Sequence, residues 1–425
     1  SEERLRIVPG IGITVTGEVA ASQDYPITRP TLNFNFTSQK KLDPRITYQR
    51  TGPASFVNEF GKVVIVGDNV PRFDHDPTTR ECKGLLIEES RTNQLIFSSD
   101  ITDNGSQNSG YSITNGTVTG DQTTAPDGTT TADQFAANST NNIHRVSIYF
   151  TSGQISNSTA YTFSVFAKAN GYDKLHIRYG GYNADNHGLG YDLSDGTTFA
   201  GKFDGTGSLD AVTSSSMIAY PNGWYRCSFT FTTASDSATG SAGIFYYISN
   251  SESTTSFAGD GSSGMHFWGA QMEVGAFPTS YIPTNGAIVT RGYEATTLEG
   301  TEFSDVFGTE FKEFSLVADY DNTQTDDGTN YGIIDLWGES TGYDDRIEWM
   351  KDNASPYHIE TRSFGQGNAT FANGNLSASN KTKSQRFATS WSVPDYSNTS
   401  SRRFVVSMGG EAVDVDAGLG TSSSS

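Results

Sequence analysis

The segment from Tyr179 to His187 combines the residue types that proteins use to bind sugars. Aromatic, amide, carboxylate and imidazole side chains occur together at Tyr179, Tyr182, Asn183, Asp185, Asn186 and His187. Sugar binding needs a flat aromatic surface for the apolar face of a pyranose, and nearby amides or carboxylates for its hydroxyls. We therefore predict a glycan-binding loop on a strand end here, with an ordinary exposed turn as the alternative.

A second group of candidate ligands is acidic. It consists of Asp319, Asp321, Asp326 and Asp327. Calcium prefers several carboxylate and carbonyl oxygens on a flexible loop, although this spacing does not match an EF-hand. Asp74, His75 and Asp76 also imitate a metal cluster, but adjacent side chains on a strand point to opposite faces. We expect no cofactor, with calcium at the Asp319 turn as the alternative to solvated side chains.

Common catalytic motifs are absent from the sequence. HExxH, GxSxG, GxxxxGK[ST] and CxxC do not occur, and the six histidines are scattered. GDGSSG at residues 259–264 satisfies GxGxxG, yet it precedes an expected strand, so no helix follows to receive a pyrophosphate. Glu348 and Asp352 lie near Trp349, but the ExDxxE arrangement of glucanases is missing. We predict that the chain is not an enzyme, and keep a polysaccharide-degrading enzyme as an alternative.

Arginine and acidic residues recur between residues 42 and 93. The motifs there are LDPRITYQR, PRFDHDP and KGLLIEESRTN, and their candidate structural residues are Asp43, Arg45, Arg50, Arg72, Asp74, Glu88, Arg91 and Asn93. Arginine forms bidentate contacts with carboxylates. We expect these side chains to pair with one another or to bond to backbone carbonyls, and so to lock hairpins that join an N-terminal arm to later domains.

Short strands separated by turns must position these residues. Residues 1–30 have the composition of an extended arm, residues 31–95 hold short β-rich runs, and LLIEESRTNQLI fits either a helix or a strand. Runs such as HRVSIYFT and AYTFSVFAKA recur through residues 96–285, and a further set fills residues 286–425. We predict an all-β, multidomain chain of antiparallel β-sandwiches or jelly rolls. Trp224 and Trp268 stand among alternating apolar residues, which predicts a place in the core.

The three motifs between residues 42 and 93 resemble a signature of tail-fibre and related virion proteins of tailed bacteriophages. GWYRCSFTFT and FWGAQMEVGAFPTSYIPT resemble the carbohydrate-binding-like jelly rolls of phage tail proteins, and residues 286–425 resemble concanavalin-like lectin sandwiches. This resemblance implies a tail fibre or tail adhesin that is assembled in the host cytoplasm, carried on the virion and attached to host-surface glycans. Other virion proteins and a homo-oligomer, with a trimer favoured, are the implied partners.

A different structural role and the completeness of the last sandwich remain open. A capsid-decoration or baseplate protein could use the same sandwiches without binding sugar. The concanavalin-like fold would also be expected to add closing strands after AGLGTSSSS, either from a longer chain or from a partner subunit, because an open sheet edge invites pairing.

The charge balance disfavours some partners. With 28 basic and 48 acidic side chains, the formal net charge of −20 repels nucleic-acid phosphates and anionic membranes. No run of about 18 apolar residues is present. We therefore expect neither nucleic-acid binding nor membrane insertion. Cys82 and Cys227 are too few for a disulfide framework or a zinc site.

Overall fold

The computed structural model describes residues 34–102, 110–203 and 209–307 in full, and the strands between residues 313 and 417 as backbone. Strands predominate in these residues, and they pair antiparallel in each sheet. One α-helix is described, α1 (Gly300–Phe307). The predicted all-β fold is confirmed. Within the described residues, no helix has the length and apolar character needed to cross a membrane.

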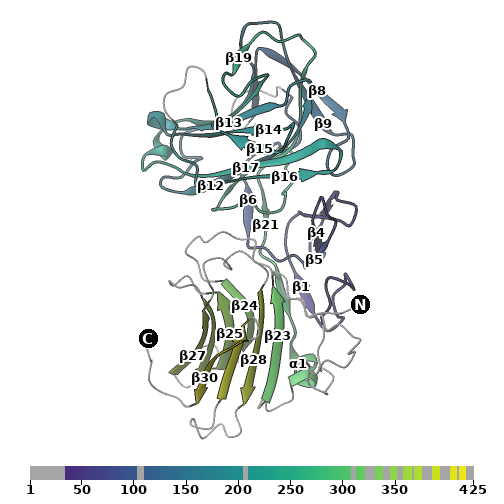
Figure 1. The fold of residues 1–425 in the computed structure, drawn as a ribbon, viewed down its shortest axis with the longest axis vertical. Coiled ribbons are helices and arrows are strands. Elements are labelled where there is room, and N and C mark those ends of the chain that lie inside the picture. Colours follow the sequence, from purple (N-terminus) through teal and green to yellow (C-terminus); the bar gives the residue numbers. More distant parts are fainter. Residues whose placement is uncertain are drawn as a thin grey trace.

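Four short ribbons lie between the two larger parts of the chain (Figure 1). They pair β1 (Thr47–Gln49) with β22 (Ala295–Thr297), β2 (Ala54–Val57) with β3 (Val63–Val66), β4 (Phe73–His75) with β5 (Cys82–Leu85), and β6 (Arg91–Asn93) with β21 (Val289–Arg291). Residues 289–297 thus return to the motifs of residues 42–93, across the boundary that we placed at residue 285. The ambiguous segment LLIEESRTNQLI contributes the end of β5 and all of β6, so it is extended there and not helical.

Two six-stranded antiparallel sheets form the largest unit. The first has the order β15 (Thr197–Phe199), β14 (Asn186–Asp192), β13 (Lys174–Gly180), β18 (Ala242–Ser249), β11 (Arg145–Phe150) and β7 (Tyr111–Thr114). The second has the order β16 (Ser214–Tyr220), β17 (Trp224–Thr232), β12 (Ala160–Asn170), β20 (Gly264–Val274), β9 (Ala132–Ala137) and β8 (Gly116–Thr123). A small ribbon pairs β10 (Asn142–Ile143) with β19 (Ser256–Phe257). Short 3₁₀ turns lie at η1 (Tyr182–Ala184), η2 (Pro221–Gly223) and η3 (Ser237–Thr239).

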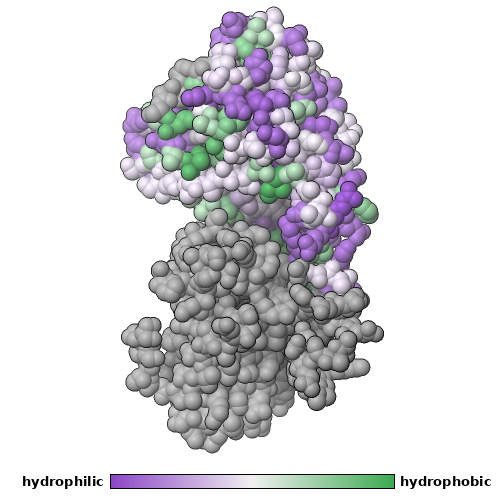
Figure 2. All heavy atoms as spheres, viewed as in Figure 1, coloured by the Kyte–Doolittle hydropathy of each residue, from purple (hydrophilic) through white to green (hydrophobic). Residues whose placement is uncertain are grey.

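The main core lies between these two sheets. Strand β17 shows the cause, because its side chains alternate between two faces and Cys227, Phe229 and Phe231 all point inward. Trp224 is 1% exposed and Trp268 is 2% exposed, as predicted, but both belong to a separate cluster that includes Val63 of β3. That cluster therefore holds the ribbons against the outer face of the second sheet. On the face seen in Figure 2, hydrophilic and weakly polar residues cover most of the sandwich.

The C-terminal strands form two further antiparallel sheets. One has the order β23 (Glu313–Tyr320), β28 (Gln385–Ser392), β29 (Arg403–Met408) and β30 (Glu411–Ala417). The other has the order β24 (Tyr331–Trp337), β25 (Asp345–Lys351), β26 (His358–Gly365) and β27 (Asn368–Asn375). Strand β27 contacts β29 and β30, so the two sheets approach each other there.

The expected calcium turn falls mainly outside the described residues. Asp319 is the penultimate residue of β23, and Asp321, Asp326 and Asp327 lie beyond the end of that strand, outside the part of the chain that the structure describes. Calcium at this turn stays a prediction.

Candidate functional site

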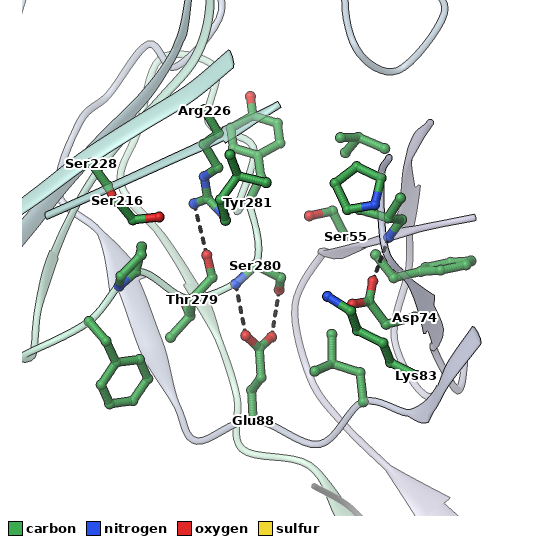
Figure 3. Close-up of a pocket in the computed structure, with 18 of the residues that line it drawn as sticks. Ser55, Asp74, Lys83, Glu88, Ser216, Arg226, Ser228, Thr279, Ser280 and Tyr281 are labelled. Atoms are coloured by element: carbon green, nitrogen blue, oxygen red, sulfur yellow. Dashed lines mark hydrogen bonds between the residues drawn. The ribbon is translucent and has the colours of Figure 1, made fainter. Parts of the chain in front are cut away.

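A cavity of about 490 Å³ lies between the short ribbons and the outer face of the second sheet. Figure 3 shows its two walls, with Ser216, Ser228 and Arg226 on the side of the sandwich and Asp74 and Lys83 on the side of the ribbons. The volume falls within the range of small-ligand pockets, about 300–1,000 Å³. We call this cavity the ribbon cleft and treat it as the candidate functional site.

Hydroxyl side chains form one wall of the ribbon cleft. They are Ser214, Ser216, Ser228 and Thr230. Because Cys227 and Phe229 point into the core, the alternation along β17 places Ser228 and Thr230 on the outer face. Strand β16 pairs beside it in a register that sets Ser216 opposite Ser228. The hydroxyl of Thr230 is already bonded to Thr162 and to the carbonyl of Ala276. The serine hydroxyls of this wall can both donate and accept hydrogen bonds.

A carboxyl group and an amine form the opposite wall. Asp74 of β4 accepts a hydrogen bond of 2.7 Å from the backbone N–H of Val57. Burial raises the pKa of Asp74 to about 6, although this hydrogen bond and the nearby Lys83 favour its charged form. Asp74 can therefore act as a hydrogen-bond donor in mildly acidic solution and as an acceptor at higher pH.

Glu88 forms the floor between the two walls (Figure 3). Ser280 donates to it from both its backbone N–H (2.8 Å) and its hydroxyl (2.6 Å). Arg72 and Arg291 form ion pairs with the same carboxylate at 2.8 and 2.9 Å. Burial alone would raise the pKa of Glu88, but Arg291, Arg72 and Ser280 outweigh it and lower the pKa to about 2. Glu88 is thus a fixed and fully engaged anion.

Aromatic rings and one guanidinium complete the lining. Tyr220 and Phe277 line the ribbon cleft and remain partly exposed. Arg226 is 9% exposed and donates from Nη2 to the carbonyl of Thr279 at 2.8 Å and to the hydroxyl of Ser164 at 3.0 Å. Hydroxyls, aromatic edges and a few charged groups are the usual lining of sites for polar organic ligands.

The predicted glycan loop has a different character from the one expected. Tyr179 is fully buried in the main core and stacks on Phe231 with ring centroids 4.4 Å apart, because it alternates in phase with Leu175 and Ile177 along β13. Its ring therefore cannot offer an open surface to a sugar, which corrects that part of the prediction. Tyr182 is 41% exposed, and the side chain of Asn183 beside it bonds to Asp236 at 2.6 Å.

The other predicted loop residues are buried and occupied by internal contacts. Asn186 accepts a hydrogen bond of 2.6 Å from Arg178. His187 contacts the Asp185 carboxylate through Nε2 and the carbonyl of Ala211 through Nδ1, both at 2.9 Å. Asp185 also accepts from Ser237 at 2.6 Å. These contacts fix the loop in place and leave few polar atoms for a ligand.

Three potential metal-ligating atoms lie within 4.8 Å of one another beside this loop, one each from Asp185, His187 and Asp210. Burial opposes the charge of His187, but the contact with Asp185 outweighs it and raises the pKa of the imidazole. The contact between the imidazole of His187 and the Asp185 carboxylate therefore accounts for the geometry. Within the fully described residues, these three side chains are the candidate site for a divalent cation.

The candidate structural residues of the signature meet partners both near and far. Asp43 pairs with Arg45 through two hydrogen bonds, of 2.9 and 2.8 Å, and Arg91 pairs with Glu89. Asn93 donates to the carbonyls of Ala270 and Ile282 at 3.1 and 3.0 Å. The contacts of Asn93 tie β6 to the sandwich.

Buried arginines hold the ribbons together through an acid that sequence reasoning missed. Arg50 contacts the backbone carbonyls of Gly52 and Gly67, and its Nε lies 3.2 Å from Glu294. Arg72 makes a second ion pair with Glu294 at 2.6 Å and donates to the carbonyl of Ser55. Glu294 follows β21 in RGYEATT, and nothing in that local sequence indicates its distant partners.

Comparisons with known proteins give weak likenesses. No family model matches the chain, and no curated protein matches it. Among solved structures, the enzymatically active domain of tailspike protein 4 of bacteriophage CBA120 is similar with a TM-score of 0.23 and 12% identity, over 41% of this chain and 21% of that chain. An exo-β-agarase is similar with a TM-score of 0.25 and 8% identity, over 44% of this chain and 25% of that chain. The chain spans a quarter or less of either protein, and we draw no functional conclusion from scores this low.

Proposed function

We propose that this chain is a structural protein of a phage tail that attaches to host-surface saccharides, and that the ribbon cleft is its saccharide-binding site. The observation that carries the proposal is the composition of the cleft. A wall of serine and threonine side chains faces Asp74 and Lys83 across a cavity of about 490 Å³, with Tyr220 and Phe277 partly exposed beside it. Hydroxyls and a carboxyl suit sugar hydroxyls, and aromatic rings suit the apolar face of a pyranose.

The position of the cleft supports an attachment role. Its ribbon wall is built from the motifs that resemble the tail-fibre signature, and Glu88 and Ser280 link that wall to the sandwich at its floor. A ligand held there would contact parts of the protein that buried ion pairs already fix in place. A weak site gains effective affinity when several copies act together, so a symmetric oligomer, with a trimer favoured, is part of the proposal.

Binding without hydrolysis is the mechanism that the acidic groups support. A retaining glycosidase needs a free carboxylate as nucleophile beside a general acid. Asp74 has the raised pKa of a general acid, but both oxygens of Glu88 are already occupied by Ser280, Arg72 and Arg291. We therefore expect no release of reducing sugar when the purified chain is incubated with host envelope, and sustained release would favour the enzymatic alternative.

An array of bacterial envelope saccharides tests the binding role directly. The full chain is expected to bind a restricted set of these saccharides. Electron micrographs of virions labelled with antibody against the chain are expected to show label on the tail. Label on the capsid, together with an array that gives no binding, would favour the decoration role instead.

A further inference from the structure

We propose that the saccharide recognised in the ribbon cleft carries a carboxylate, and that Arg226 binds this carboxylate. The inference rests on the proposed function and adds the chemical class of its ligand. It comes from a difference between Arg226 and the other buried arginines of the described residues.

Four described arginines are buried, and three of them are neutralised by glutamate. Arg50 and Arg72 form ion pairs with Glu294, and Arg291 forms one with Glu88. Arg226 forms no ion pair with a carboxylate of the described residues, and its contacts there are with hydroxyl, carbonyl and ring groups. A buried charge without a counter-charge is energetically costly. A ligand anion would supply the missing counter-charge.

The guanidinium of Arg226 also has donors to spare. Its two hydrogen bonds to described residues both start from Nη2, and its buried Nε lacks a partner among the described residues. Nη1 likewise makes no hydrogen bond to a described residue. Nε and Nη groups form the planar fork that binds the two oxygens of a carboxylate. Each of these forks includes Nη2, which already donates to Thr279 and Ser164, and Nε is buried, so Nη1 is the donor that remains for one charge-assisted hydrogen bond to a carboxylate.

The surroundings hold this guanidinium in a fixed orientation. Thr279 and Ser164 anchor Nη2, and the guanidinium carbon lies 5.6 Å from the centre of the Phe166 ring. Such a cation–π contact leaves the edge of the plane free for hydrogen bonds. Figure 3 shows the side chain at the sandwich wall of the cleft, bonded to Thr279. A donor fixed in this way loses little conformational entropy when it binds.

The other charges at the cleft are compatible with an anion. Lys83 supplies a second cation on the opposite wall, at 3.6 Å from Asp76. Glu88 is neutralised by Arg72 and Arg291. Two further acids of the lining, Asp76 and Glu89, pair with Lys83 and Arg91. Asp74 has no such ion pair among the described residues, so its neutral form favours anion binding. The hydroxyl wall is left to contact the hydroxyls of the sugar ring, which distinguishes an acidic sugar from a small inorganic anion.

Isothermal titration of the full chain tests the inference with matched ligands. The probes are trigalacturonate, its trimethyl ester and inorganic phosphate, at one ionic strength. The ester keeps the size and the hydroxyls of the sugar and removes its charge. We expect the acid to bind about 10- to 100-fold more tightly than the ester, the range typical of hydrogen bonds to charged groups. We expect phosphate to compete weakly or not at all.

Variants locate the effect at one side chain. Arg226→Gln is expected to bind the acid and the ester equally, and Arg226→Lys to keep part of the difference, because lysine retains the charge but not the fixed planar guanidinium. Arg80→Gln is the control, since it removes the same charge from an exposed residue outside the cleft. Circular dichroism establishes whether each variant is folded. The comparison of acid with ester on the unmodified chain does not depend on any variant.

The outcomes separate this inference from the proposed function. Equal binding of acid and ester by the unmodified chain would overturn the inference and leave saccharide binding in place. Strong binding of phosphate with none of the acid would overturn the saccharide class. If neither this panel nor an array of envelope saccharides gave binding, the proposed function would fall as well.

Discussion

Arg72 and Glu294 lie 222 residues apart in the sequence and form a bidentate ion pair, with Nε–Oε1 at 2.8 Å and Nη2–Oε2 at 2.6 Å. Both side chains are fully buried. The pair joins the motifs of residues 42–93 to the segment that follows β21, so the ribbons form one interlocked unit although their strands are short. The ribbon cleft depends on this unit for one of its walls.

Replacing Glu294 by glutamine should destabilise the ribbons strongly. Arg50 and Arg72 would both lose a charged partner inside the protein, which typically costs about 3–5 kcal/mol. Urea denaturation of the full chain, followed by tryptophan fluorescence, measures the loss, because Trp224 and Trp268 pack where the ribbons meet the sandwich. Glu299→Gln changes an exposed acid nearby and should shift stability by less than about 0.5 kcal/mol. Equal effects of the two variants would contradict the importance of the buried pair.

Asp74 should make stability fall as the pH rises toward neutrality. Its pKa is about 6 in the folded chain and 3.8 for an aspartate free in water, so the folded state binds the proton more tightly. The folded state is then favoured fully below about pH 4, and this advantage is lost as the pH rises through 6. Asp74→Asn keeps an oxygen for the Val57 N–H but cannot ionise.

The Asp74 prediction is measured as a difference between two chains. The free energy of unfolding of Asp74→Asn, relative to that of the unmodified chain, should rise by about 1–3 kcal/mol from pH 4 to pH 7. This amount allows for less than the full pKa shift of Asp74, because its side chain still reaches solvent. Glu252→Gln, which changes an exposed acid, should show no such trend. A constant difference across this pH range would mean that Asp74 is already ionised at pH 4.

Tyr182 should contribute little to saccharide binding. It is the exposed aromatic of the loop that the sequence indicated, but it lies on η1 and does not line the ribbon cleft. We expect Tyr182→Ala to change the dissociation constant for an array-positive saccharide by less than about twofold, since exposed residues outside a site contribute little. A loss of tenfold or more would return the binding site to the loop.

Local patterns in the sequence predict what depends on neighbouring residues. Alternation correctly indicates strands and places Trp224 and Trp268 in a core. The same alternation in KLHIRYG sets Tyr179 in phase with Leu175 and Ile177, so its burial was available from the sequence. Residue types alone favour a sugar site in this loop, whereas the strand period places Tyr179 in the core.

Contacts between distant segments could not be predicted in this way. Glu294 reaches Arg72 because β21 pairs with β6 and β22 pairs with β1, and no local pattern specifies those pairings. The hydroxyl wall has a weak signal in CSFTF at residues 227–231, where Ser228 and Thr230 alternate with apolar residues. Its opposite wall comes from residues 55–89, so the cleft exists only once the ribbons dock on the sandwich.

Blocking the ribbon cleft tests the account most directly. Ser216→Trp would fill the cavity from its hydroxyl wall, whereas Thr213→Trp adds the same side chain at an exposed position outside the lining. On an array of envelope saccharides, we predict that Ser216→Trp loses binding by at least about tenfold while Thr213→Trp binds as the unmodified chain does. Undiminished binding by a folded Ser216→Trp chain would contradict the assignment of the cleft as the saccharide site.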